Sequence, residues 1–497
     1  MTNLAEVLAS TAGRVPGHVA ISFEGSAVTY AELEAWARRV SADLVSAGVQ
    51  PGDRVAVWLG NHPAFAAVMY GAWRCGAVVV PVHAMLTAPE ARHILRDSEA
   101  KVVFSGPAQL AAAEELAAEL PTLERVFGTG GPLDPNATQS SETSPIAEVG
   151  DDDLALIPYT SGTSGLPKGA MLTHGNLLAN LEQMSRTPIA IGPDDAVLCV
   201  LPLFHIFGLN VVLNLSVRAG AKVVLLERFD PQGSLDAIRA QGVTVVAGAP
   251  PVYVAWLGLT DAPSDAMANV RVAVSGAAPL PKEVLAGFRE RFGVTIWEGY
   301  GLTETAPALT FTGIGGVAKP GSIGRPLDDV EIRLVDPNGD DVESGDPGEI
   351  IVRGPNVFSG YWNNPEHTQA SFADGWFRTG DVGVADDDGD LYIVDRRGDL
   401  ILVSGFNVYP REVEDVIRRH PNVGDCAVVG DHDDHTGERV RAVVVPDPPG
   451  ETVTPEQIIE FCARSLAHYK LPSQVDIVAE IPRNAAGKVL RRVLREP

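Results

Sequence analysis

The 497-residue chain is acidic, with 64 aspartates and glutamates against 38 lysines and arginines and a formal charge of −26 at pH 7. Such a charge repels nucleic acid and anionic membranes, so neither is expected as a general partner. The four cysteines are widely separated, which argues against a disulfide framework or a cysteine-based zinc site, and the N-terminus lacks signal-peptide features, so we expect a cytoplasmic protein.

The first two-thirds of the chain alternate apolar, β-rich runs with amphipathic helical patterns. Residues 18–25 are expected to form a strand, and Thr29 then caps a helix with Glu32 as its capping-box partner. Residues 54–60 and 77–82 are near-continuous apolar runs, as buried parallel strands require. Similar runs follow at 195–203, 221–227, 243–250 and 270–278. The alternation predicts an α/β fold with parallel sheets covered by helices.

The remaining chain has a different pattern. Residues 317–395 are rich in Gly, Pro and Asp with short alternating strands, which predicts a small antiparallel, barrel-like β subdomain. Within it, DDDGD at 386–390 is interpreted as a hairpin turn, because the EF-hand spacing of a calcium loop is absent. The last segment combines a helix at 410–420, two strands, and a helix that begins at Thr454, which predicts a compact α+β domain.

Segments rich in glycine and hydroxyl side chains follow several predicted strands. The clearest is YTSGTSGLPKG, residues 159–169, because small residues let backbone N–H groups approach an oxyanion and Lys168 adds positive charge. It is not a Walker A loop, since Gly169 stands where that motif has a Mg²⁺-binding hydroxyl. Further polar segments are PLFHIFG (202–208), SGAAPL (275–280), WEGYGLTET (297–305), WFRTGD (376–381), DRRGDLILVSGFNVYPREVE (395–414) and PRNAAGKVLRRVL (482–494).

In this order and approximate spacing, the segments resemble those of the adenylate-forming (ANL) superfamily over essentially the whole chain. That superfamily comprises acyl-CoA synthetases, aryl-CoA ligases, peptide-synthetase adenylation domains and firefly-type luciferases. The stretches MLTHGNLLANLEQ, EGYGLTETAP and VSGFNVYP resemble fatty acyl-CoA synthetases most closely. The resemblance implies that a carboxylate attacks the α-phosphorus of ATP, that pyrophosphate leaves, and that the thiol of coenzyme A displaces AMP to form a thioester.

The resemblance also implies a division into two domains. Residues 1–396 correspond to the AMP-binding N-terminal domain with the ATP and acyl sites, and residues 397–497 to a mobile C-terminal lid. Lys488 of the lid is expected to bridge the carboxylate and the α-phosphate, so the domains must close for adenylation. At the hinge, Gly398 replaces the Asp or Lys that is usual in the family, which permits wide rotation but removes a charged contact.

The nucleotide site is expected to gather residues from several segments. The resemblance implies that the loop after Thr160 cradles the β- and γ-phosphates, that Thr160 and Glu304 bind Mg²⁺, that Tyr300 stacks on adenine, and that Asp381 binds the ribose hydroxyls. The full expected ATP-binding set is Thr160, Ser161, Gly162, Thr163, Ser164, Gly165, Lys168, Gly276, Ala277, Ala278, Glu298, Gly299, Tyr300, Gly301, Thr303, Asp381, Arg396 and Lys488. Lys488, Glu304, His205 and Thr160 are expected to be catalytic.

The acyl and thiol sites follow from the same resemblance. The acyl wall is expected to contain His205, Phe207, Leu209, Tyr253 and Gly276. Leu209 occupies the position of a tryptophan gate found in some long-chain synthetases, so a gated tunnel of that kind is not expected here. Gly405 and Phe406 are expected to lie at the channel for the pantetheine arm of coenzyme A.

No Arg or Lys falls in the predicted acyl wall, and an unpaired second carboxylate would be costly to bury there, so diacids are disfavoured. The favoured substrate is a medium- to long-chain fatty acid, with a benzoate- or cinnamate-type acid as the nearest rival. Three alternatives remain: loading of a carrier protein instead of coenzyme A, a catalytically silent scaffold, and an added luciferase-like oxygenase activity.

No membrane-spanning segment is expected, and peripheral membrane contact stays open. The protein is expected to be a monomer or homodimer.

Overall fold

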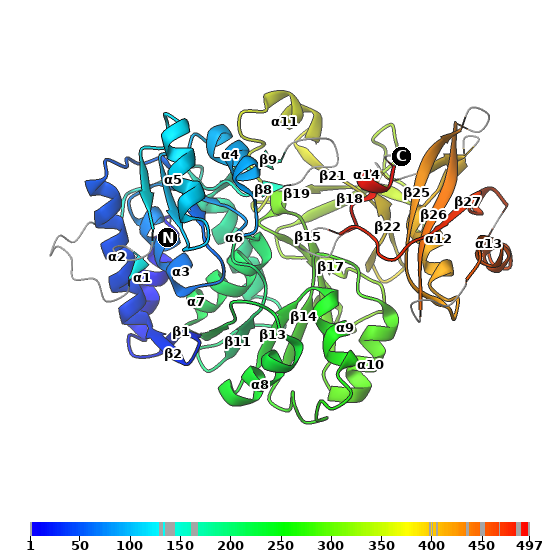
Figure 1. Cartoon of the computed structure of the whole chain (residues 1–497), viewed down its shortest axis with the longest axis horizontal. Helices are drawn as coiled ribbons and strands as arrows, with labels where there is room; N and C mark the ends of the chain where they lie inside the picture. Colours follow the sequence, from blue (N-terminus) through cyan, green and yellow to red (C-terminus); the bar gives the residue numbers. More distant parts are fainter. Residues whose placement is uncertain are drawn as a thin grey trace. The chain divides into compact units, whose positions relative to one another are not determined.

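The chain folds into two compact units (Figure 1). The first comprises Met1–Glu331 and Val352–Phe377, and the second Ile332–Ile351 and Arg378–Pro497. The boundary predicted between residues 396 and 397 lies inside the second unit, and a hinge there stays a prediction. The computed structural model describes residues 2–128, 133–134, 145–160, 167–396, 399, 401–403, 406–433, 437–447, 453–466, 468–483 and 489–495.

The larger sheet of the first unit has nine strands in the order β17-β16-β15-β14-β13-β11-β12-β1-β2. Its central strands pair in parallel, as the apolar runs predict, and the antiparallel pairs lie at its two ends. The strands are β1 (Val19–Phe23), β2 (Ser26–Thr29), β11 (Ala196–Cys199), β12 (Lys222–Leu225), β13 (Val245–Gly248), β14 (Val272–Ser275), β15 (Ile296–Gly301), β16 (Ala308–Phe311) and β17 (Arg325–Pro326).

A second sheet of the first unit has the order β10-β7-β4-β3-β5-β6, with β3, β4, β5 and β6 paired in parallel. It contains β3 (Arg54–Trp58), β4 (Val78–Pro81), β5 (Val102–Ser105), β6 (Arg125–Phe127), β7 (Leu154–Leu156) and β10 (Leu172–Thr173). A separate two-stranded ribbon of β8 (Tyr159–Thr160) and β9 (Lys168–Gly169) forms the stem of the glycine- and serine-rich loop.

Helices cover these sheets, and their starts follow local capping rules. Thr29 accepts a hydrogen bond from the backbone N–H of Glu32, and the Glu32 carboxylate accepts one from the N–H of Thr29, which confirms the predicted capping box. The helices are α1 (Ala5–Arg14), α2 (Tyr30–Ser46), α3 (Pro63–Arg74), α4 (Ala88–Asp97), α5 (Leu110–Glu119), α6 (His174–Ser185), α7 (Leu215–Ala219), α8 (Pro231–Gln241), α9 (Pro250–Gly258), α10 (Lys282–Phe292) and α11 (Pro365–Ser371).

The rest of the chain forms two smaller sheets. One has the order β18-β19-β21-β20 with β22 beside β21, and its β20–β21 and β21–β22 pairs are antiparallel, as predicted. The other has the order β24-β23-β26-β25 with β27 beside β26. Thr454 caps α13 with Gln457 as partner, as the sequence indicates. Bounds are β18 (Glu331–Val335), β19 (Gly348–Arg353), β20 (Phe372–Ala373), β21 (Trp376–Ala385), β22 (Leu391–Arg396), β23 (Ile401–Val403), β24 (Phe406–Val408), α12 (Pro410–Ile417), β25 (Val423–Asp433), β26 (Gly437–Pro446), α13 (Pro455–Ala463), β27 (Gln474–Ile477) and α14 (Arg491–Arg495).

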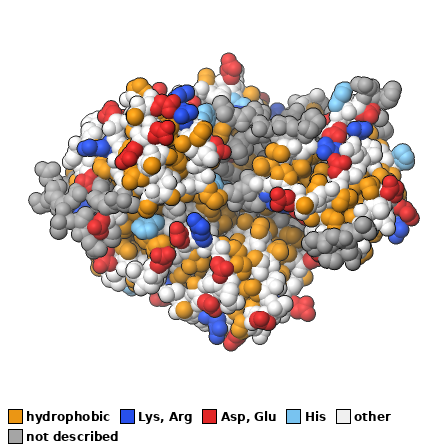
Figure 2. Space-filling model, viewed as in Figure 1, with side chains coloured by type: hydrophobic (Ala, Val, Ile, Leu, Met, Phe, Trp, Pro, Cys, Tyr) orange, Lys and Arg blue, Asp and Glu red, His pale blue; other side chains and the backbone are white. Residues whose placement is uncertain are grey.

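Charged side chains are spread over the surface, and the cysteines lie in the interior. On the face drawn in Figure 2, acidic and basic side chains are scattered among apolar and polar ones. All four cysteines are buried and free of disulfides. None of the helices formed by the described residues combines the length and apolar character that crossing a bilayer needs.

Buried His174 makes the stability of the first unit depend on pH. Its side chain is 0% exposed, and its Nδ1 accepts a hydrogen bond from the backbone N–H of Leu4 at 3.2 Å. Burial lowers the pKa of His174 from 6.5 to about 4, and the charge of Asp153 opposes this shift. The unfolded chain therefore binds the proton first, so stability present above pH 6.5 is lost as the pH falls toward 4.

We expect protonation of His174 alone to lower the free energy of unfolding by about 2 kcal/mol between pH 7 and pH 5. Urea unfolding of the wild type and of His174→Asn at pH 7 and pH 5 measures this change in the free energy of unfolding. The variant should be less stable at pH 7 but should lose less stability on acidification. Equal pH slopes for the two proteins would contradict an abnormally low pKa at His174.

Candidate active site

The stem of the glycine- and serine-rich loop places Lys168 beside an imidazole. Thr160 pairs with Lys168 across the β8–β9 ribbon. Lys168 Nζ lies 2.8 Å from His367 Nε2 and 5.8 Å from the centroid of the Tyr361 ring. Burial lowers the pKa of Lys168, while the charge of Glu304 acts in the opposite direction. A lysine, a histidine, a tyrosine and a carboxylate therefore form one cluster in the first unit.

Glu304 forms the carboxylate side of this cluster. It lies in the short 3₁₀ turn η3 (Thr303–Thr305) and is only 9% exposed. The hydroxyl of Tyr361 donates a hydrogen bond to Glu304 Oε1 at 2.8 Å. Burial raises the pKa of Tyr361 and the Glu304 charge raises it further, so the phenol keeps its proton and acts as a donor. Lys168, predicted to bind ATP, and Glu304, predicted to bind Mg²⁺, thus both contact Tyr361.

The ends of β14 and β15 form a second part of the site. Ser275 pairs with Glu298, which brings residues 276–278 beside residues 298–301. A Cβ on Gly276 would lie 3.1 Å from the Phe207 ring and 3.4 Å from the carbonyl oxygen of Gly299. Glu298 Oε2 accepts a hydrogen bond from the N–H of Leu280 at 3.3 Å, which orders the turn after β14. The structure therefore brings together three segments that the sequence separates widely.

His205 precedes an uncommon helix. Residues Phe207–Asn214 form a π-helix, η2, and all of them are buried. The N–H of Phe207 donates to Nδ1 of His205 at 3.3 Å. Burial lowers the pKa of His205, and the nearby His83 lowers it further, so the imidazole is neutral at pH 7. With Nδ1 accepting, its proton resides on Nε2, and His205 offers a neutral N–H donor.

Two residues predicted at the acyl wall are packed in the interior. Tyr253 is 0% exposed, its hydroxyl donates to the carbonyl of Val274 at 2.6 Å, and its ring packs edge-on against Trp256 and Phe288. Leu209 is also 0% exposed. The structure gives both residues a packing role, and contact of either with an acyl chain stays a prediction.

Asp381 belongs to the second unit, on β21, opposite Arg396 of β22. It is 3% exposed, and its N–H donates to Thr379 Oγ1 at 3.1 Å. Several predicted positions lie outside the described residues: Ser161, Gly162, Thr163, Ser164, Gly165, Gly398, Gly405, Lys488 and the side chains of Arg396 and Phe406.

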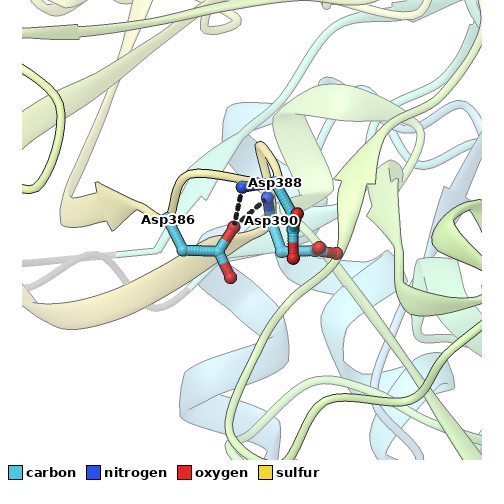
Figure 3. Close-up of side chains that lie close together, drawn as sticks. All are labelled: Asp386, Asp388 and Asp390. Atoms are coloured by element: carbon cyan, nitrogen blue, oxygen red, sulfur yellow. Dashed lines mark hydrogen bonds between the residues drawn. The ribbon is translucent and has the colours of Figure 1, made fainter.

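The aspartates of DDDGD form the turn that the sequence predicts. Asp386 Oδ1 accepts hydrogen bonds from the N–H groups of Asp388 and Asp390 at 3.0 and 2.9 Å, which closes the loop between β21 and β22 (Figure 3). One oxygen from each of the three carboxylates lies within 4.8 Å of the others. The backbone donors already account for this geometry as a turn.

Tyr361 and His367 are residues that sequence reasoning missed. Both lie in the segment GYWNNPEHT, residues 360–368, which carries no glycine-rich or paired-carboxylate pattern. Asn210 was also missed: from within η2 its Nδ2 donates to the carbonyl of Ala306 at 2.7 Å, which links the His205 segment to the turn that holds Glu304. The one available signal was a polar residue inside an apolar run, which must find a partner when buried.

The fold and these grouped segments define an adenylate-forming enzyme. A family model described as "AMP-binding enzyme" matches residues 8–362, and one described as "AMP-binding enzyme C-terminal domain" matches residues 412–488. The chain belongs to the AMP-binding enzyme family, within the adenylate-forming superfamily, and it is an acyl-CoA synthetase.

Relatives match over nearly the full length. A feruloyl-CoA synthase from Amycolatopsis sp is 39% identical over 482 residues, covering 97% of this chain and 96% of that protein. A long-chain-fatty-acid–CoA ligase from Bacillus subtilis is 34% identical over 528 residues, covering 99% and 94%. The crystal structure of ATP-bound MatB from Rhodopseudomonas palustris has a TM-score of 0.93 at 36% identity and covers 100% of this chain and 99% of that one.

Proposed function

We propose that the enzyme activates a compact aromatic monocarboxylic acid of the arylpropenoate type with ATP and transfers the acyl group to coenzyme A. The observation that carries the substrate class is the packing after His205. Phe207 is 8% exposed, and its ring lies against Gly276. In this proposal the acyl site is bounded by Phe207 and Gly276, and such a site suits a short, flat acid better than a long chain. The similarity to a feruloyl-CoA synthase supports the same class.

In this proposal, the central difficulty of the first step is charge. An anionic carboxylate must approach the α-phosphate of ATP, so cations and N–H donors must stabilise the negative charge at phosphorus. Lys168 supplies a cation beside the phosphates, and Lys488 supplies another at the reacting groups. His205 donates Nε2–H to the carboxyl group, which orients that group without adding a fixed positive charge.

The remaining residues bind and orient the nucleotide. Tyr300 stacks on adenine, Asp381 accepts from the ribose hydroxyls, and the backbone of residues 276–278 follows the adenine edge. The Glu304 carboxylate and the Thr160 hydroxyl are the hard oxygen donors that Mg²⁺ prefers, so these residues fit magnesium. Bound there with ATP, Mg²⁺ would neutralise phosphate charge.

A medium- to long-chain fatty acid is the second candidate, and similarity to the Bacillus subtilis ligase favours it. Pyrophosphate release with Mg-ATP, measured across straight-chain and aromatic acids with and without coenzyme A, separates the candidates. We expect the highest kcat/KM with a cinnamate-type acid and stimulation by coenzyme A.

A preference for fatty acids of eight or more carbons would replace the aromatic proposal. Adenylate formation that coenzyme A does not advance would point to a carrier-protein acceptor instead. Absence of pyrophosphate release with every acid would favour a silent scaffold.

A further inference from the structure

Backbone hydrogen bonds join the segment 360–368 to the chain at the stem of the glycine- and serine-rich loop. The N–H of Trp362 donates to the carbonyl of Gly169 at 2.8 Å, and the N–H of Met171 donates to the carbonyl of Gly360 at 2.9 Å. His367, at the start of α11, donates its N–H to Asn364 Oδ1 at 3.1 Å. These backbone contacts fix the place of His367 relative to Lys168.

The hydrogen bond between Lys168 and His367 can have only one direction, with the ammonium group as donor. An ammonium group has three donors and no acceptor, so His367 Nε2 must accept. This requires a neutral imidazole with its proton on Nδ1. Burial lowers the pKa of His367, and the charge of Lys168 lowers it further, which is consistent with the neutral form. The ring also lies 4.9 Å from that of Tyr361, which restricts its rotation.

We propose that His367 is a positioning residue for ATP: its Nε2 holds the Lys168 ammonium in the orientation that receives the triphosphate. This rests on the proposed role of Lys168 in phosphate binding. One of the three ammonium donors is used by His367, and two remain for phosphate oxygens. A lysine side chain that is ordered beforehand loses less conformational freedom when ATP binds, so affinity for ATP is higher.

His93, on α4, gives a comparison because it contacts the chain directly before β9 of the stem. Its Nε2 lies 2.9 Å from the carbonyl oxygen of Pro167, one residue before Lys168. A carbonyl only accepts, so His93 donates and holds the backbone rather than the ammonium. Replacement of His93 by glutamine therefore serves as a matched control, because it alters a histidine that contacts the chain beside Lys168 without removing the acceptor of Lys168.

The test compares KM for Mg-ATP and kcat in pyrophosphate release by the full-length enzyme. His367→Leu keeps an apolar side chain against Tyr361 but removes the acceptor, and it should raise KM for Mg-ATP about three- to tenfold with kcat changed less than about twofold. His367→Gln retains an acceptor oxygen and should restore most of the affinity. His93→Gln should leave KM for Mg-ATP within about twofold of wild type.

A double-mutant cycle with Lys168→Met shows whether His367 acts through the lysine. In that background, His367→Leu should have no further effect on KM. If Lys168→Met raises KM and His367→Leu does not, or if His367→Leu adds its full effect to that of Lys168→Met, the positioning role is wrong while the role of Lys168 stands. If Lys168→Met leaves KM unchanged, the proposed phosphate role of Lys168 is wrong, and the inference falls with it.

Discussion

Replacement of Lys488 by alanine is expected to lower the rate of adenylation by about 100-fold or more while leaving thioester formation from supplied acyl-adenylate nearly unchanged. The reason is that a cation at the α-phosphate stabilises charge that develops only in the first half-reaction. In the second half-reaction AMP is already attached to the acyl group, and the lysine has no such charge to stabilise. Lys488 lies outside the described residues, so this expectation rests on the motif NAAGKVLRR.

Single-turnover measurements with each half-reaction started separately provide the test. Gly405→Leu is the converse control, because a leucine there should obstruct the pantetheine channel and slow thioester formation while sparing adenylation. Opposite effects of the two variants would establish that the two steps use different residues of the second unit. Equal loss of both half-reactions in Lys488→Ala would remove the lysine from a step-specific role.

The regular elements were predictable because their causes are local. The run AVVVPV at 77–82 needs no distant information to indicate a buried strand, and β4 pairs in parallel with β3 as expected. The capping box at Thr29 depends on residues three apart and is present as predicted. The order of polar segments was also sufficient to recognise the family.

The partners of the site residues were not predictable in the same way. His367 is 199 residues from Lys168, and Tyr361 is 57 residues from Glu304, so no local pattern connects them. The residues after His205 form a π-helix, which their apolar composition could not indicate, because an α-helix with the same composition would also be buried. For Tyr253, an aromatic residue beside a predicted pocket was equally consistent with the interior position that the structure shows.

Gly301→Ala is expected to destabilise the first unit by about 3 kcal/mol or more and to remove adenylation activity. A Cβ at Gly301 would lie 1.7 Å from the carbonyl oxygen of Pro307. The position of a Cβ is fixed by its own backbone and the carbonyl belongs to the backbone, so no side-chain rotation can relieve the clash. The same carbonyl accepts hydrogen bonds from the N–H of Leu302 and the hydroxyl of Thr305. Any backbone movement that admits the methyl group therefore disturbs both bonds and displaces the turn that carries Glu304.

Gly299→Ala is the matched control for stability, because it adds the same methyl group two residues earlier in the same strand. Its Cβ would meet no atom closer than the Thr310 carbonyl oxygen at 3.7 Å, which is ordinary contact. Urea unfolding should place Gly299→Ala within about 1 kcal/mol of wild type and Gly301→Ala far below it. If Gly301→Ala were as stable as the control, the close approach of β15 to Pro307 would not be a feature of the folded enzyme. If it were unstable yet fully active in adenylation at low temperature, the turn that holds Glu304 would not be needed for ATP.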